Sequence, residues 1–116
     1  MPDSANSDYP IEIDAQSVKQ LLDAREDFEF IDCREEEEYN RCNIAGAKLL
    51  PMSQLLDRAG ELESAMTKRV VVHCHHGGRS LRVASWLRER GFAHAQSMKG
   101  GIDDWSVNID QSVPRY

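Results

Sequence analysis

The stretch Arg69–Leu87, which reads RVVVHC-HHGGR-SLRVASWL, contains the signals that decide the fold. Its run of β-branched residues at 70–72 is typical of a buried strand. Gly77 and Gly78 permit a tight turn after that strand. The following segment predicts a helix, because small or apolar residues recur at the spacing of one helical face: Ser80, Val83, Ala84 and Leu87. The stretch therefore predicts a strand, a short loop and a helix, with the thiol of Cys74 where the strand ends.

The same alternation of strands and helices continues along the rest of the chain. Four more segments predict strands, at residues 11–13, 28–32, 48–50 and 93–98. Helix signals lie between them: the caps Asp14 and Ser53, the four acids at 35–38, and Gly91 as the residue just past a helix end. Strands that alternate with helices at this spacing imply an α/β domain with a mainly parallel sheet.

The two ends of the chain carry weaker signals. Residues 1–9 are polar and predict a flexible lead, so we expect one domain over residues 10–116. After Gly100-Gly101 the sequence predicts a helical turn at Ile102–Trp105, with Trp105 facing inward. From Val107 onward we expect a short tail over the surface.

Composition narrows the function. The chain has 116 residues with 14 basic and 20 acidic side chains, giving a net charge of −6, which argues against non-specific nucleic-acid binding. No apolar run approaches the ~20 residues of a membrane span, and the start lacks the pattern of a secretion signal. The three cysteines are an odd number, which fits free thiols in the cytoplasm. We expect neither a nucleic-acid nor a membrane partner.

The loop after Cys74 has features that activate a thiol. A free cysteine has a pKa of about 8.5, and a helix N-terminus or a neighbouring cation lowers it. The loop 75–79 is able to direct backbone N–H groups inward as an anion nest, and we expect Gly77 and Gly78 to supply the backbone angles. Arg79 either tightens the loop or faces the anion. Such a thiolate suits two-step covalent catalysis.

Three features together resemble the single-domain rhodanese-like sulfurtransferases. They are the strand end Phe30–Glu35, the segment Glu38-Tyr39 through Ile44–Ala47, and the loop Cys74–Ser80 followed by Gly100–Trp105. The similarity extends over roughly Ile11 to Trp105. The resemblance implies a rhodanese-like α/β fold, with a five-stranded, mainly parallel sheet and helices on both faces.

The resemblance also implies an activity. Cys74 would be the nucleophile that takes a sulfane sulfur from a small sulfur-containing anion or a persulfide donor. A thiol, cyanide or a protein would then accept the sulfur. The persulfide would lie in the anion-binding loop, formed by His75, His76, Gly77, Gly78 and Arg79, and no cofactor is implied.

The sequence departs from the family pattern at three places. Cys33 stands where a valine commonly follows the aspartate, Cys42-Asn43 replaces a common Gly-His, and His75-His76 occupies the loop. We expect Cys33 and Cys42 to be small buried thiols. A resolving role for either would require contact with Cys74.

Supporting roles are expected for three more residues. Asp32 and Arg34 are expected to pair with neighbouring groups at the end of the second strand, beside the loop. Ser80 is the first small residue of the helical face that follows the loop. His73 is expected to be structural, whereas His75 and His76 are expected at the loop rim.

Three alternatives compete with sulfur transfer. A cysteine-dependent phosphatase uses Cys-x5-Arg, but the spacing from Cys74 to Arg79 is Cys-x4-Arg, and the longer spacing falls on Ser80. A non-catalytic or sulfur-carrier module that binds a protein partner is the second, and the intact loop argues against an inactive one. The third is a metal site at residues 73–76, but four consecutive residues rarely converge tetrahedrally. We therefore expect no metal.

Overall fold

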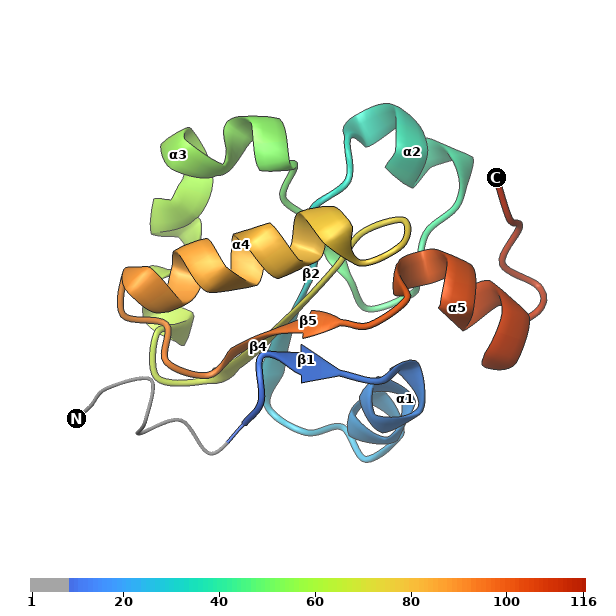
Figure 1. Cartoon of the computed structure of the whole chain (residues 1–116), viewed down its shortest axis with the longest axis horizontal. Coiled ribbons are helices and arrows are strands. Elements are labelled where there is room, and N and C mark those ends of the chain that lie inside the picture. The colour runs from blue at the N-terminus through green and yellow to red at the C-terminus, as the bar shows by residue number, and fades with distance from the viewer. Residues whose placement is uncertain (1–8) are drawn as a thin grey trace.

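The computed structural model describes residues 9–116, so the predicted flexible lead lies, except for Tyr9, outside the described residues. Five strands form one parallel sheet in the order β1-β5-β4-β2-β3 (Figure 1). Their bounds are β1 Glu12–Ile13, β2 Phe28–Asp32, β3 Lys48–Leu49, β4 Arg69–His73 and β5 Ala95–Met98. The predicted five-stranded parallel sheet is confirmed, and β4 is its middle strand.

Helices cover both faces of this sheet, as predicted. Figure 1 shows α3 and α4 on one side and α1 and α5 toward the other. The bounds are α1 Ala15–Asp23, α2 Glu36–Arg41, α3 Leu55–Arg58, α4 Gly78–Glu89 and α5 Gly101–Asn108, with 3-10 segments η2 Met52–Gln54 and η3 Ala59–Ala65 beside α3.

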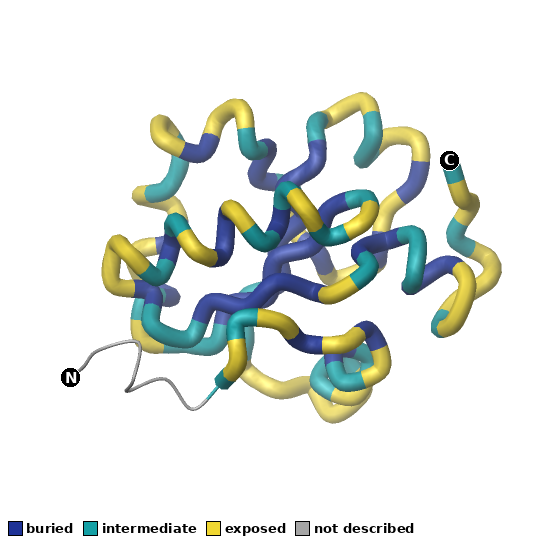
Figure 2. The backbone as a smooth tube through the Cα atoms, viewed as in Figure 1, coloured by how far each residue is buried: buried dark blue, intermediate teal, exposed yellow. Residues whose placement is uncertain are grey.

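The two faces bury two separate apolar clusters. Side chains alternate along a strand, so Val70 and Val72 of β4 pack in the cluster under α3 and α4. Val71 packs in the opposite cluster, which includes Val18 of α1 and Trp105 of α5. Figure 2 shows the strands as the buried centre of the chain. Burial on both faces explains the unbroken β-branched run in β4.

Most of the predicted helix ends are confirmed. Asp14 caps α1, because its Oδ1 accepts a hydrogen bond from the N–H of Ser17 at 2.8 Å. Gly91 follows the C-cap of α4 with a positive φ of 103°. The predicted helix cap at Ser53 is wrong. Ser53 lies inside η2, and its hydroxyl donates to the Glu35 carboxylate at 2.5 Å, a charge-assisted hydrogen bond, whereas a helix cap would accept from an N–H group.

The last helix is longer than the predicted single turn. It continues to Asn108, and Trp105 is buried in the core as predicted. The tail after α5 is mostly exposed, but its final residue, Tyr116, packs against the cluster that contains Trp105. The tail thereby returns the chain toward the carboxyl end of the sheet.

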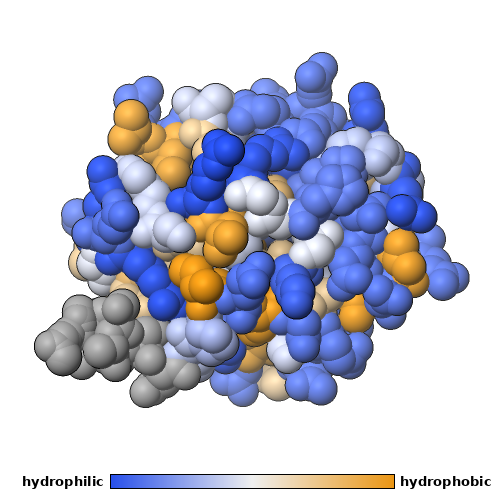
Figure 3. Space-filling view, in the orientation of Figure 1, coloured by the Kyte–Doolittle hydropathy of each residue, from blue (hydrophilic) through white to orange (hydrophobic). Residues whose placement is uncertain are grey.

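The visible surface is mostly hydrophilic, with hydrophobic side chains over α3 (Figure 3). Leu56 of α3 is 79% exposed. It lies at a groove of about 300 Å³ whose other lining residues are Met52, Leu55, Arg82, Val83 and Trp86. Within residues 9–116, no helix is long and apolar enough to cross a membrane.

Candidate active site

The candidate site lies beyond the carboxyl ends of β4 and its neighbour β2. Cys74 follows β4 directly, and Cys33 follows β2 directly. In open parallel sheets, ligands bind in the crevice outside the carboxyl ends of the strands. The position of Cys74 is therefore the one that this architecture offers for a ligand.

Four donors surround the sulfur of Cys74. The N–H groups of Gly77 and Ser80 donate to Sγ at 3.1 and 3.3 Å, and the Ser80 hydroxyl oxygen lies 3.3 Å from it. The thiol of Cys33 has the largest influence on this sulfur, and together these groups lower the pKa of Cys74 to about 4 although burial opposes this. Cys74 is thus a thiolate at neutral pH.

Gly77 turns the loop so that these N–H groups point inward. It is the N-cap residue of α4 and has a φ of 109°, a conformation that a side chain disfavours. A Cβ on Gly77 would also lie only 3.3 Å from the backbone nitrogen of Gly100. The expectation that Gly78 supplies special backbone angles is wrong. Gly78 begins α4, has no positive φ, and faces open space.

The start of α5 holds the loop from the other side. The N–H groups of Ile102 and Asp103 donate to the carbonyl oxygens of Cys74 at 2.8 Å and His75 at 3.1 Å. This approach requires Gly101, because a Cβ there would collide with both carbonyl oxygens. The Gly100-Gly101 pair therefore serves the loop as well as ending β5.

A buried serine pair supports the sulfur site from below. The hydroxyls of Ser80 and Ser97 lie 2.8 Å apart, and both residues are fully buried. Ser97 belongs to β5 and was not predicted as a site residue. The available signal is its presence in a fully buried strand, where a hydroxyl needs a partner.

Arg79 tightens the loop instead of facing the sulfur. Its guanidinium donates two hydrogen bonds to the Glu38 carboxylate, at 2.7 and 2.9 Å. This pairing, with help from Tyr116, holds the pKa of Glu38 down at about 2. The arginine thereby joins the start of α4 to α2.

Asp32 and Arg34, expected to pair with neighbouring groups, pair with each other at the end of β2 and are fully buried. The closest approach is 2.7 Å between Arg34 Nη2 and Asp32 Oδ2. Arg34 also donates to the carbonyl oxygen of Cys42 at 2.7 Å and to the hydroxyl of Tyr116 at 2.9 Å. His73 lies beside them, with Nε2 3.6 Å from Asp32 Oδ2, and burial lowers its pKa. His73 is therefore a neutral, structural side chain.

The rim of the loop is a stack of three rings. The ring of His75 stacks on Tyr116 at 4.0 Å and on His76 at 3.9 Å between centroids. Tyr116 also donates from its hydroxyl to Glu38 at 2.8 Å. This contact bridges 78 sequence positions, and no local signal predicts it. Across residues 9–116, no three His, Cys, Asp or Glu side chains lie together in a way that could hold a metal ion.

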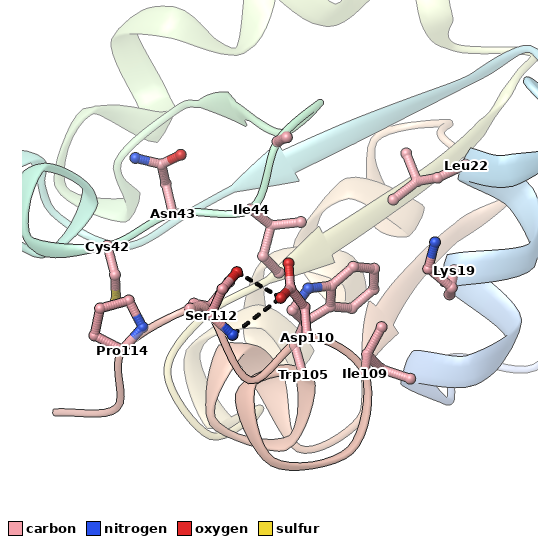
Figure 4. Close-up of a pocket in the computed structure, with 12 residues that line it drawn as sticks. Lys19, Leu22, Cys42, Asn43, Ile44, Trp105, Ile109, Asp110, Ser112 and Pro114 are labelled. Atoms are coloured by element: carbon pink, nitrogen blue, oxygen red, sulfur yellow. Dashed lines mark hydrogen bonds between the residues drawn. The ribbon is translucent and has the colours of Figure 1, made fainter.

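A larger hollow lies away from Cys74. It encloses about 660 Å³ between α1, the segment 42–45 and the tail, and no residue of the loop 74–79 lines it. Figure 4 shows Ser112 hydrogen-bonded to Asp110 at its mouth, with Pro114 beside Cys42. These contacts lead the tail toward the position of Tyr116.

The geometry can be compared with known proteins. Residues 14–108 match the rhodanese-like domain family. A sulfurtransferase of Allochromatium vinosum is 32% identical over 95 residues, which cover 82% of this chain and 87% of that protein. A chloroplastic rhodanese-like/PpiC domain-containing protein of Arabidopsis thaliana is 34% identical over 99 residues, or 84% of this chain. The chain spans only 30% of that plant protein's length.

Solved structures give the same architecture. A rhodanese-like domain protein of Staphylococcus aureus superposes with a TM-score of 0.75 at 26% identity, covering 92% of this chain and 99% of that one. A human single-domain sulfurtransferase superposes with a TM-score of 0.76 at 20% identity, covering 86% and 98%. The second likeness concerns the fold alone.

Proposed function

The chain belongs to the rhodanese-like domain family, and from that premise we propose that it is a sulfurtransferase that works through a persulfide on Cys74. The observation that carries the proposal is the set of hydrogen bonds on Cys74 Sγ, which lowers its pKa to about 4. A thiolate is the form of cysteine that attacks sulfur.

The first half-reaction loads the enzyme. With thiosulfate as donor, the Cys74 thiolate attacks the outer, sulfane sulfur. The new bond joins the two sulfurs, the bond inside thiosulfate breaks, and sulfite leaves with the electron pair. The negative charge then lies on the outer sulfur of the persulfide. The first-turn N–H groups of Gly78 and Arg79 lack acceptors within the helix, so they are suited to bind that charge.

The second half-reaction removes the outer sulfur from the Cys74 persulfide. A nucleophilic acceptor, such as cyanide, a thiol or a protein thiolate, attacks the outer sulfur and takes it away. The electrons of the broken bond return to Sγ, and the Cys74 thiolate is restored. The two-step route predicts ping-pong kinetics.

Two features favour sulfur over phosphate as the group transferred. The donors of Gly77 and Ser80 contact Sγ itself, so the loop closes around a single sulfur atom. The guanidinium of Arg79, which a phosphatase would turn to the phosphoryl oxygens, is bound by Glu38.

The sulfur donor and the cellular compartment are also part of the proposal. The donor we propose is a small sulfur-containing anion or a persulfide, because both present a sulfane sulfur. His75 and His76 at the rim are placed to meet that donor. The three free thiols suit a reducing compartment, and we propose the cytoplasm.

Intact-mass measurement after incubation with thiosulfate tests the proposal. The wild-type chain is expected to gain the mass of one sulfur atom, and cyanide is expected to remove it as thiocyanate. Cys74→Ser is expected to gain nothing, whereas Cys42→Ala, which removes another buried thiol, is expected to behave as wild type. If the wild-type chain neither gains sulfur nor releases sulfide after incubation with thiosulfate or a small persulfide, sulfur transfer through Cys74 is wrong.

A further inference from the structure

Cys33 and Cys74 are opposite residues on neighbouring parallel strands. The register pairs Asp32 with His73, and the N–H of Cys33 donates to the carbonyl oxygen of His73 at 3.0 Å. In a parallel ladder, this bond places Cys33 opposite Cys74. Neighbouring strands lie about 4.7–4.9 Å apart, within the Cα separation of about 4.4–6.8 Å that a disulfide spans.

Their side chains also share one face of the sheet. Both cysteines belong to the apolar cluster under α3 and α4. Cys33 lies on the same face as Ile31 of β2, and Cys74 lies on the same face as Val70 and Val72 of β4. The Cys33 thiol donates its proton toward the sulfur of Cys74. Cys42 is also buried but belongs to the opposite cluster, on the other side of the sheet.

We propose that Cys33 is a second catalytic thiol, which resolves the Cys74 persulfide, releases its outer sulfur as hydrosulfide and leaves a Cys33–Cys74 disulfide. This rests on the proposed function, because only persulfidated Cys74 presents a sulfur to be released. It adds a reductive outcome to sulfur transfer, in which the product is sulfide and no external acceptor takes the sulfur.

The step balances without an outside oxidant. The Cys33 thiol gives its proton to the anionic outer sulfur and, as a thiolate, attacks Sγ of Cys74. The Cys33–Cys74 sulfur bond forms, the persulfide bond breaks, and hydrosulfide leaves with its electron pair. The two cysteine sulfurs are oxidised by two electrons and the sulfane sulfur is reduced by two. A dithiol or two monothiols then reduce the disulfide and restore both cysteines.

The resolving reaction of Cys33 competes with sulfur transfer to an external acceptor. Cys33 has no exposed surface, so its thiol reacts with the neighbouring Cys74 and not with a cysteine of another chain. An acceptor that enters the loop promptly takes the outer sulfur before Cys33 does. When no acceptor is present, the Cys33 route empties the site and leaves the protein as a disulfide that cannot be loaded again until it is reduced.

The decisive experiment follows a loaded protein without an acceptor. Fully reduced wild type, Cys33→Val and Cys42→Ala are loaded with thiosulfate under anaerobic, mildly alkaline conditions, desalted and followed by intact mass and sulfide assay. Wild type and Cys42→Ala are expected to lose the added sulfur, release about one sulfide per chain and end two hydrogens lighter than the reduced protein. Cys33→Val is expected to keep its added sulfur at least about tenfold longer.

Two outcomes would contradict the proposals, each in a different way. If wild type and Cys33→Val lose sulfur at the same rate, or no mass lower by two hydrogens appears, the resolving role of Cys33 is wrong while sulfur transfer stands. If no variant gains sulfur at all, the proposed function itself fails. Peptide mapping of loaded wild type supplies the answer if Cys33→Val does not fold, because a Cys33–Cys74 crosslink must then appear in loaded protein and be absent from unloaded protein.

Discussion

Two buried polar clusters meet at the carboxyl ends of β2 and β4, one on each face of the sheet. Around Cys74 the donors are neutral: one S–H, one O–H and two N–H groups. On the other face Arg34 and Asp32 form a formal ion pair with no exposed surface. Neutral donors are able to serve an anion whether it lies on the inner or the outer sulfur, whereas an ion pair fixes two groups in one geometry. The Asp32–Arg34 ion pair thus holds the end of β2 in place, whereas the groups around Cys74 are neutral donors.

Removing one ion of the fixed pair gives the largest expected effect. Arg34→Met leaves Asp32 buried and uncompensated, which is expected to lower the free energy of unfolding by about 3–5 kcal/mol. Urea denaturation measures it. The double variant Asp32→Asn/Arg34→Met is expected to recover part of the loss, because no unpaired charge remains. If Arg34→Met is as stable as wild type, the Asp32–Arg34 pair does not act as a fixed ion pair, in contrast to the neutral donors around Cys74.

Removing the Cys33 thiol tests the cluster around Cys74. Cys33→Val is expected to raise the pKa of Cys74 above its value of about 4. A hydrogen bond to a charged group is worth about 1.5–3 kcal/mol, or about one to two pH units. The rate of Cys74 alkylation, measured against pH, falls as the thiolate is protonated, so its inflection is expected at higher pH in the variant. An unchanged inflection would mean that Cys33 does not stabilise the thiolate, and Cys42→Ala is the matched control.

The two adjacent glycines of the loop offer a smaller contrast. Gly77→Ala forces a side chain into a left-handed conformation and is expected to destabilise by about 1–3 kcal/mol and to slow persulfide formation. Gly78→Ala meets open space at the helix start and is expected to be neutral or to stabilise by at most about 0.5–1 kcal/mol. Thermal unfolding and sulfur loading measure both. Equal losses in the two variants would contradict the assignment of the turn to Gly77.

The partly exposed pair of Arg79 and Glu38 is expected to contribute least. Glu38→Gln is expected to lower stability by no more than about 1 kcal/mol. Because folding lowers the pKa of Glu38 from 4.5 to about 2, its contribution is fully present above pH 4.5 and is lost as the pH falls through 2. The difference in stability between wild type and Glu38→Gln, measured from neutral to acid pH, should therefore shrink on acidification. If the stability difference between wild type and Glu38→Gln grows as the pH falls, the predicted pH dependence of the Glu38 contribution is wrong.

The sequence predicts those parts of the fold that local patterns encode. The β-branched run of β4, the cap at Asp14 and the glycine at 91 each depend on residues close in the chain, and all three are confirmed. Ser53 misled because a cap is a local signal, whereas the acceptor that its hydroxyl binds, Glu35, lies 18 positions away.

Only some contacts of the candidate site join residues that are close in the sequence. Cys74 and its loop follow one another in the chain, so their proximity is predictable. Further contacts that hold the loop and the start of α4 come from elsewhere: Ser97 from β5, Glu38 from α2 and Tyr116 from the tail. No periodicity connects residues so far apart, because their meeting depends on strand order and register.

The main-chain clamp between α5 and the loop has an evolutionary consequence. The loop is held at the carbonyls of Cys74 and His75 and turned at Gly77, so none of these restraints passes through the side chains at positions 75 and 76. Mutation can therefore change these two side chains without removing the main-chain hydrogen bonds that hold the loop.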